Sequence, residues 1–304
     1  MVKPATSLLD RARGAILGHA AGNALGVPTE FLHTPEAIAR RFPGGVVDVV
    51  RADRPDSPWD DDVAMAVVVA EELLGPRPDP REILRRWVRW KESDGRGIGA
   101  WTATALEYFA RHDAPIPDAH GNAGNGAVMR TIPVALATHR QPRALLHAAC
   151  GIAALTHPDP RCVWSAAAVA VACAQLLQGR RDFLPDVVEA LRTNDAPAEV
   201  LDAVRRVPRE RREDLVLTGP AAGYTVLCME AALWAAWHER SLESALAWLA
   251  GAGGDTDTNA AVAGGLLGAR DGEGAIPRRW VEAVARWEYL GELGERLVGG
   301  SGER

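Results

Sequence analysis

Two short acidic segments carry the residues whose types and spacing could support chemistry. Asp60–Asp62 stand together directly before an apolar helical stretch, and Asp255, Asp257 and Thr258 precede another such stretch. One aspartate would be enough to cap a helix, whereas adjacent carboxylates repel one another. The helix dipole favours negative charge at this end by only about 0.3 to 1 kcal/mol per group. A bound cation is the simpler explanation for the clustering.

The oxygen-only side chains of these segments indicate which cations would suit them. Carboxylate and hydroxyl oxygens favour magnesium, manganese or calcium over zinc or copper. If the second segment is extended, its i, i+2 spacing places Asp255 and Asp257 on the same side, while Thr258 caps the next helix or offers its hydroxyl oxygen. Five carboxylates would converge if the two segments meet, which is the charge expected for two divalent ions. The alternative is two separate, solvated helix caps, and spacing alone does not decide between them.

Helices must position these residues, because alanine, leucine and tryptophan recur along the chain at helical rather than alternating spacing. Segments rich in glycine and proline separate the stretches. Residues 46–50 are the nearest candidate for a strand. We therefore predict an all-α fold in a single domain, 1–304. The predicted helices are Leu8–Leu25, Asp62–Leu74, Arg81–Trp90, Ala100–Ala110, Ala144–Leu155, Arg161–Leu177, Gly223–Trp237 and Leu242–Leu249, with another after Thr258.

Composition narrows the classes of partner. A chain of 304 residues that is 47% apolar can bury a substantial core. Its net charge of −6 gives no general reason to bind nucleic acid or an anionic membrane, although a local basic patch stays open. Residues 162–179 are uncharged and alanine-rich, which predicts a buried core helix rather than a membrane span. The cysteines lack metal-site spacing and are predicted to be small core residues in a reducing, cytoplasmic compartment: Cys150, Cys162, Cys173 and Cys228.

Five segments, taken in order, resemble the ADP-ribosylglycohydrolase family, which includes the hydrolase acting on ADP-ribosylated dinitrogenase reductase. They span residues 13–31, 59–66, 124–136, 223–235 and 253–269. The resemblance implies an all-α, orthogonal helix bundle with a central cleft that holds two Mg2+ or Mn2+ ions. It also implies cleavage of the bond between ADP-ribose and a protein side chain or small acceptor, which releases ADP-ribose.

The resemblance also assigns roles to residues at matching positions. Asp60, Asp61 and Asp62 match the first metal motif of the family, and Asp255, Asp257 and Thr258 match the second. Glu30 matches a glutamate proposed as catalytic, and an exposed loop glutamate is the alternative. The substrate-binding candidates are Gly124, Asn125 and Gly126 near the phosphate and ribose, Gly223 and Tyr224 near the adenosine, and His157. Tyr224 is otherwise a core tyrosine, and His157 a structural loop histidine.

Departures from the family pattern keep other functions open. Val63 cannot coordinate a metal, Asn23 replaces an aspartate, and Gly97 replaces an aspartate that some members are thought to use on arginine linkages. Asp94 is a possible substitute for the missing carboxylate. Without one, we expect arginine-linked substrates to be cleaved poorly relative to oxygen-linked ones. The alternatives are a catalytically impaired ADP-ribose-binding or crystallin-like member and a binuclear-metal phosphohydrolase.

Overall fold

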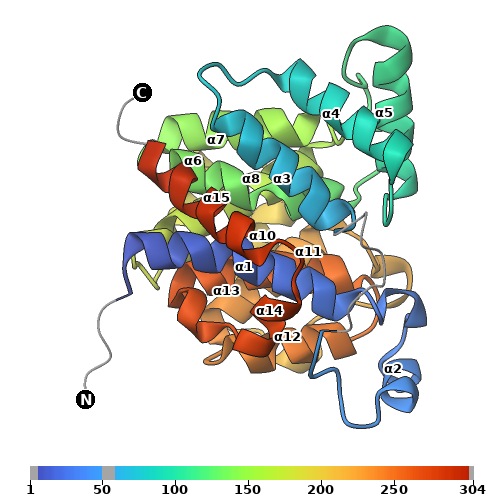
Figure 1. Cartoon of the computed structure of the whole chain (residues 1–304), viewed down its shortest axis with the longest axis vertical. Coiled ribbons are helices and arrows are strands. Elements are labelled where there is room, and N and C mark those ends of the chain that lie inside the picture. The colour runs from blue at the N-terminus through green and yellow to red at the C-terminus, as the bar shows by residue number, and fades with distance from the viewer. Residues whose placement is uncertain (1–5, 50–58, 301–304) are drawn as a thin grey trace.

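The computed structural model describes residues 6–49 and 59–300, and within these ranges the chain is helical and contains no strand (Figure 1). The run 46–49 forms only bends and irregular backbone, so the candidate strand is wrong there, and residue 50 lies outside the described residues. The helices are α1 (Leu8–Gly26), α2 (Pro35–Arg41), α3 (Asp61–Leu73), α4 (Pro80–Ser93), α5 (Ala100–His112), α6 (Ile132–Thr138), α7 (Pro142–Ala154), α8 (Pro160–Leu177), α9 (Leu184–Thr193), α10 (Ala198–Arg206), α11 (Thr225–His238), α12 (Leu242–Gly251), α13 (Thr256–Asp271), α14 (Arg278–Ala283) and α15 (Trp287–Gly299).

The longer predicted helices are confirmed, with their ends shifted by a few residues. The sequence interpretation missed α2, α6, α9, α10, α14 and α15. In α9 the signal was present, because its buried residues Leu184, Val187 and Leu191 recur at three- and four-residue spacing. Two 3-10 turns also matter for the site, namely η1 (Glu30–Leu32) and η2 (Asn125–Arg130).

Helices α1 and α13 form an antiparallel pair at the middle of the molecule, with backbone packed against backbone (Figure 1). A Cβ added to Gly18 would lie 2.3 Å from the carbonyl oxygen of Gly264, and one added to Gly264 would lie 2.1 Å from the carbonyl oxygen of Gly18. Gly14 and Gly268 face each other in the same way one turn further on. Only glycine permits such an approach. The pairing places the C-terminal end of α1 against the first turn of α13.

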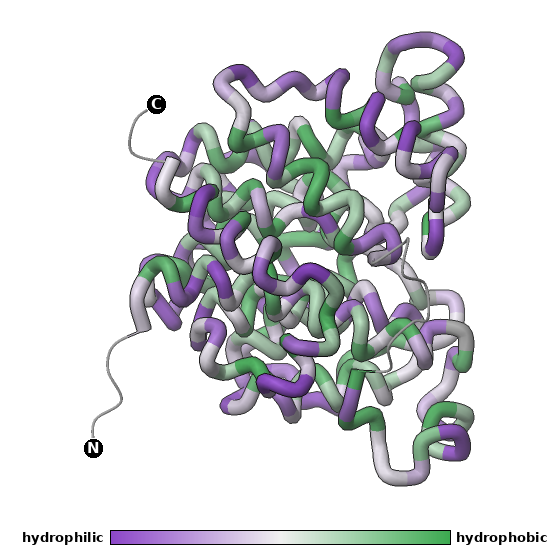
Figure 2. Tube along the Cα trace, viewed as in Figure 1, coloured by the Kyte–Doolittle hydropathy of each residue, from purple (hydrophilic) through white to green (hydrophobic). Residues whose placement is uncertain are grey.

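Helix α8 lies in the core that surrounds this pair. It is long and apolar enough to cross a membrane by length and composition, but 72% of its 18 residues are buried inside the protein. The prediction of a buried core helix is therefore confirmed. Cys162, Cys173 and Cys228 are buried, as predicted for core residues, Cys150 is partly buried, and all four are free thiols. Figure 2 shows hydrophobic residues concentrated along the central helices and hydrophilic ones along the outer loops.

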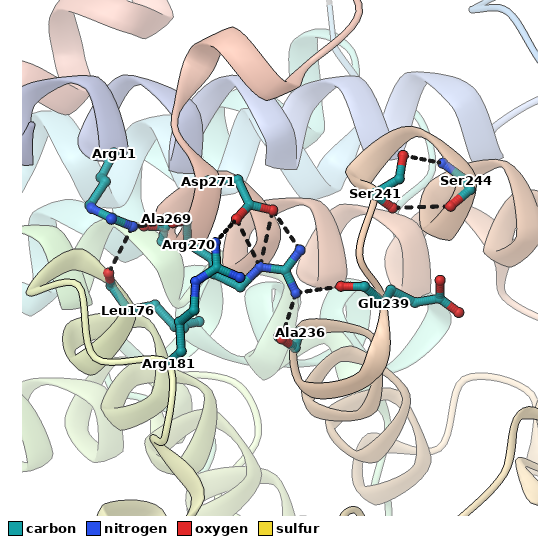
Figure 3. A network of polar contacts seen from close by, with 10 residues as sticks. All are labelled: Arg11, Leu176, Arg181, Ala236, Glu239, Ser241, Ser244, Ala269, Arg270 and Asp271. Carbon is teal, nitrogen blue, oxygen red and sulfur yellow. Dashed lines mark hydrogen bonds and ion pairs between the residues drawn. The ribbon is translucent and has the colours of Figure 1, made fainter. Parts of the chain in front are cut away.

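Two arginines donate hydrogen bonds to backbone carbonyl oxygens at the C-terminal ends of three central helices (Figure 3). Nη1 of Arg11 donates to the carbonyl oxygens of Leu176 in α8 and Ala269 in α13, at 3.4 and 3.1 Å. Nη1 of the buried Arg270 donates to the carbonyl oxygens of Ala236 and Glu239, at 2.7 Å each, where α11 ends. Such carbonyls have no partner within their own helix, and cations are favoured beside them. This network anchors the C-terminal end of α13.

Candidate active site

The first acidic segment opens α3 and is buried. Asp60 is the N-cap residue, and Asp61 and Asp62 begin the helix, yet the Asp60 side chain makes no capping hydrogen bond. The three residues are 7%, 7% and 0% exposed. The Asp62 Oδ2 atom accepts hydrogen bonds from Asn23 Nδ2 of α1 at 3.0 Å and from the Thr258 hydroxyl of α13 at 3.4 Å. Helices α1, α3 and α13 therefore meet at the Asp62 carboxylate.

The second acidic segment opens α13. The helix begins at Thr256, so the extended backbone considered for residues 255–257 is wrong. Asp255 is the N-cap residue and Asp257 lies in the first turn, but both still line the same cavity as Asp61. The hydroxyl of Thr258 donates to Asp62. The two segments are thus brought together, and the alternative of two separate, solvated caps does not hold.

The shared cavity has a volume of about 320 Å³. Glu30 lines it from η1, a turn that is tied to the start of α13. The Gly254 backbone N–H donates to the His33 carbonyl oxygen at 3.1 Å, and the buried Thr29 hydroxyl lies 3.0 Å from the Thr256 hydroxyl. The lining residues are Glu30, Asp61, Gly97, Gly99, Ala100, Trp101, Thr102, Asn122, Gly124, Asn125, Gly126, Met129, His157, Gly223, Asp255, Asp257 and Thr258.

The carboxylate oxygens of the acidic segments are suited to bind a hard divalent cation. One ligand oxygen from each of Asp60–Asp62 lies within 4.8 Å of the others. Three buried oxygens have no hydrogen-bond partner, namely the Oδ1 atoms of Asp60, Asp62 and Asp257. Buried, unpartnered carboxylate oxygens are costly unless a cation or donor meets them. The donor set is all oxygen, which suits magnesium or manganese.

Burial and mutual repulsion raise the pKa values of these carboxyl groups. Burial is the largest cause for Asp61, Asp62 and Asp257, and neighbouring carboxylates add to it, so that each pKa lies well above its usual range. Burial raises the pKa of Asp60 to about 6, although Asn23 and Arg96 act in the opposite direction. A bound cation would favour the charged forms and offset both effects.

Two departures noted in the sequence have a structural basis. Gly97 has a φ of +81°, and an added Cβ would lie 2.6 Å from Oδ1 of Asp61. A side chain at this position would strain the backbone and displace the Asp61 carboxylate, and Asp94 is not among the residues that line the cavity. Asn23 donates to Asp62, so the amide acts as a hydrogen-bond donor where the family usually has a carboxylate. Val63 is buried in the core.

The structure places most predicted substrate-binding residues at the same cavity. Gly124–Gly126, His157 and Gly223 all line it. The Asn125 amide donates to Asp255 Oδ2 at 2.8 Å, which links this loop to the acidic residues. Tyr224 is not among the residues that line the cavity, and its hydroxyl donates to Glu199 at 2.6 Å. Its proposed stacking role therefore has no support in this arrangement.

Several lining residues were missed from the sequence. Trp101 and Thr102 come from the first turn of α5. Asn122 precedes the glycine loop, and Met129 follows it in η2. The Trp101 indole N–H donates to the Thr156 carbonyl oxygen at 2.9 Å, which fixes the ring at the cavity wall. No local pattern distinguishes Trp101 from a core tryptophan such as Trp87. Asn122 had a signal, since it lies two residues before the glycine loop.

Comparisons with known proteins agree with this arrangement. The family model for ADP-ribosylglycohydrolases matches residues 4–304. ADP-ribosylarginine hydrolase Tri1 of Serratia proteamaculans is 29% identical over 97% of this chain and 80% of its own length. ADP-ribosyl-[dinitrogen reductase] glycohydrolase of Rhodospirillum rubrum is 29% identical over 91% of each chain. A solved ADP-ribosylglycohydrolase-related protein complex matches with a TM-score of 0.77 and 30% identity, over 97% of this chain and 99% of the other. The chain therefore belongs to the ADP-ribosylglycohydrolase family, with the all-α fold that its sequence predicted.

Proposed function

We propose that this chain is a metal-dependent hydrolase that cleaves the bond between ADP-ribose and a protein side chain or small acceptor and releases ADP-ribose. It is an enzyme of the ADP-ribosylglycohydrolase family. The observation that carries the proposal is the convergence of Asp61, Asp255 and Asp257 with Glu30 on one cavity, which the backbone of Gly124–Gly126 also lines. A cytoplasmic location is part of the same proposal.

We assign metal binding to the residues of the two acidic segments. Asp60, Asp61, Asp62, Asp255, Asp257 and Thr258 would hold two Mg2+ or Mn2+ ions, with Asn23 orienting Asp62. When bound, the ions would supply Lewis-acid stabilisation and a template for the ribose oxygens. The glycine loop lines the cavity, and because Gly124 carries no side chain, a diphosphate could approach the backbone there.

Glu30 is the residue we assign to proton transfer. Cleavage of a glycosidic bond passes through an oxocarbenium-like state and needs a carboxyl group that can give or take a proton nearby. Glu30 is partly buried and lines the cavity with the acidic cluster, whereas Gly97 supplies no carboxyl group. Burial, with Asp255 and Asp60 adding to it, raises the pKa of Glu30 to about 7. The assignment rests on its position in the cavity.

Gly97 favours a second candidate function, namely binding of ADP-ribose with little turnover. The missing carboxyl group would leave a site that holds the ligand but lacks one catalytic group. The two functions differ in product: turnover releases free ADP-ribose from a conjugate, and a binding protein releases none. A phosphohydrolase would instead release phosphate from a nucleotide.

Metal binding is the first test. We expect the purified, chelator-treated chain to bind two Mn2+ ions per molecule in calorimetry, because the converging carboxylates lack sufficient countercharge. Asp62→Asn and Asp257→Asn should each weaken this binding by tenfold or more, on the order of the losses seen at metal sites. Asp202→Asn is the control, since Asp202 is exposed and pairs only with Arg205 among the contacts described. Equal Mn2+ binding by all three variants would contradict the metal centre.

Substrate linkage is the second test. A panel of arginine-linked, serine-linked and ester-linked ADP-ribose conjugates would be incubated with and without Mg2+ or Mn2+ and read by mass spectrometry. We expect free ADP-ribose to appear only with metal, and faster from oxygen linkages than from arginine linkages, because Gly97 offers no carboxyl group. The competing expectation is that arginine linkages are cleaved best, because two relatives are named ADP-ribosylarginine hydrolase Tri1. Arginine conjugates as the best substrates would refute the linkage preference alone.

A further inference from the structure

A buried arginine behind the cavity plays no part in the proposed reaction. Arg130 ends η2, is 0% exposed, and its guanidinium carbon lies 4.4 Å from the ring centre of Trp87. Its Nη2 donates to the Thr156 hydroxyl, while Nε and Nη1 have no hydrogen-bond partner. A buried cation is costly unless it is paired and hydrogen-bonded, and although burial lowers the pKa of Arg130, the charge of Asp61 acts in the opposite direction. Arg130 does not line the cavity, so any effect on a ligand must pass through another residue.

Thr156 is the link to the cavity. Its hydroxyl oxygen is 2.7 Å from Nδ1 of His157, and the residue is 0% exposed. Arg130 only donates, so it occupies a lone pair of this oxygen. If Nδ1 also carried a proton, the Thr156 hydroxyl hydrogen would face no acceptor among the contacts described for it. If Nδ1 is unprotonated, the hydroxyl accepts from Arg130 and donates to His157, and every group is satisfied.

The other side of the His157 ring faces the glycine loop. His157 is 2% exposed and lines the cavity. A Cβ added to Gly126 would lie 2.7 Å from its Cε1 atom and 3.1 Å from its Nε2 atom. Glycine at 126 therefore leaves room for the ring and keeps the Nε2 edge at the loop. Burial, with the Arg130 charge adding to it, lowers the pKa of His157 well below its usual range, so the ring is neutral.

We propose that Arg130 acts through Thr156 to hold His157 as the tautomer that carries its proton on Nε2, ready to donate to a ligand oxygen in the cavity. Arg130 and Thr156 are then positioning residues. The oxygen would be a phosphate or hydroxyl oxygen, either of which accepts such a bond. Only this ligand step rests on the proposed function, because the tautomer is a property of the free protein.

The tautomer is measured first, without ligand or activity. In the full chain labelled with 15N, long-range 1H–15N correlation spectra assign the ring nitrogens, with His157→Gln identifying the signals. We expect wild-type His157 to be protonated at Nε2. Thr156→Val removes the hydroxyl at nearly constant shape and should introduce the Nδ1–H form, and Thr156→Ser should restore the wild-type pattern. Protonation at Nδ1 in the wild type, or no change in Thr156→Val, would overturn the proposal even if a variant folds poorly.

The ligand step is measured by ADP-ribose titration with Mn2+ present. Losing one hydrogen bond from a fixed donor should raise the Kd of Thr156→Val about tenfold, with Thr156→Ser near wild type. A change in kcat alone, with no change in Kd or KM, would contradict donation to the ligand. If wild-type protein does not bind ADP-ribose, the proposed function fails, while the tautomer measurement still decides the role of Thr156.

Discussion

Replacing Glu30 by glutamine is expected to lower kcat by about 10²- to 10⁴-fold, the usual contribution of a general acid or base. Glutamine keeps the size of the side chain but cannot give or take a proton at this position. Glu30 lines the cavity together with Asp61, Asp255 and Asp257, and no carboxyl group is present at Gly97. Single-turnover release of ADP-ribose from a defined conjugate would measure the chemical step directly.

Two controls separate a catalytic role for Glu30 from a structural one. Glu36→Gln changes an exposed glutamate on the neighbouring α2 and should leave kcat unchanged. Mn2+ and ADP-ribose affinities of Glu30→Gln should remain close to wild type, because Glu30 is not among the residues assigned to hold the metal and glutamine keeps the size of the side chain. Turnover by Glu30→Gln within a fewfold of wild type would refute the assignment and leave the metal centre standing.

A large loss of stability is expected from Gly18→Ala in α1. The new methyl group would lie 2.3 Å from the carbonyl oxygen of Gly264, so the two helices must separate. Because the obstacle is backbone, no change of side-chain rotamer relieves it. We expect the free energy of unfolding to fall by about 3 kcal/mol or more, at or beyond the upper end of ordinary overpacking. Chemical denaturation monitored by circular dichroism would measure the change.

Gly151→Ala is the matched control for this substitution. Gly151 also lies inside a helix, α7, but it is exposed and a Cβ there would meet nothing within 4 Å. Alanine should stabilise α7 by about 0.5 to 1 kcal/mol, through its higher helix propensity. Gly18→Ala should also weaken Mn2+ binding, since α13 carries Asp257. Similar unfolding free energies for the two variants would show that the α1–α13 contact tolerates separation.

The sequence by itself determined most of the long helices and the donor chemistry. Helical spacing of apolar residues predicted the long helices, because amphipathic and buried faces are a property of neighbouring residues. Clustered aspartates predicted an oxygen-ligand cation site for the same local reason: adjacent charges repel without a partner. The resemblance to a family then selected Glu30 and Gly124–Gly126, and the structure places these residues at one cavity.

Only the tertiary structure decided which distant residues meet. The glycines of α1 and α13 were visible in the sequence, but their mutual contact depends on two backbones about 250 residues apart packing antiparallel. The same packing leaves Tyr224 outside the cavity lining and brings Trp101 to its wall. It also connects Arg130, Thr156 and His157. Local patterns do not encode such contacts, because they arise from how whole helices fit together and which buried polar groups that fit leaves to be satisfied.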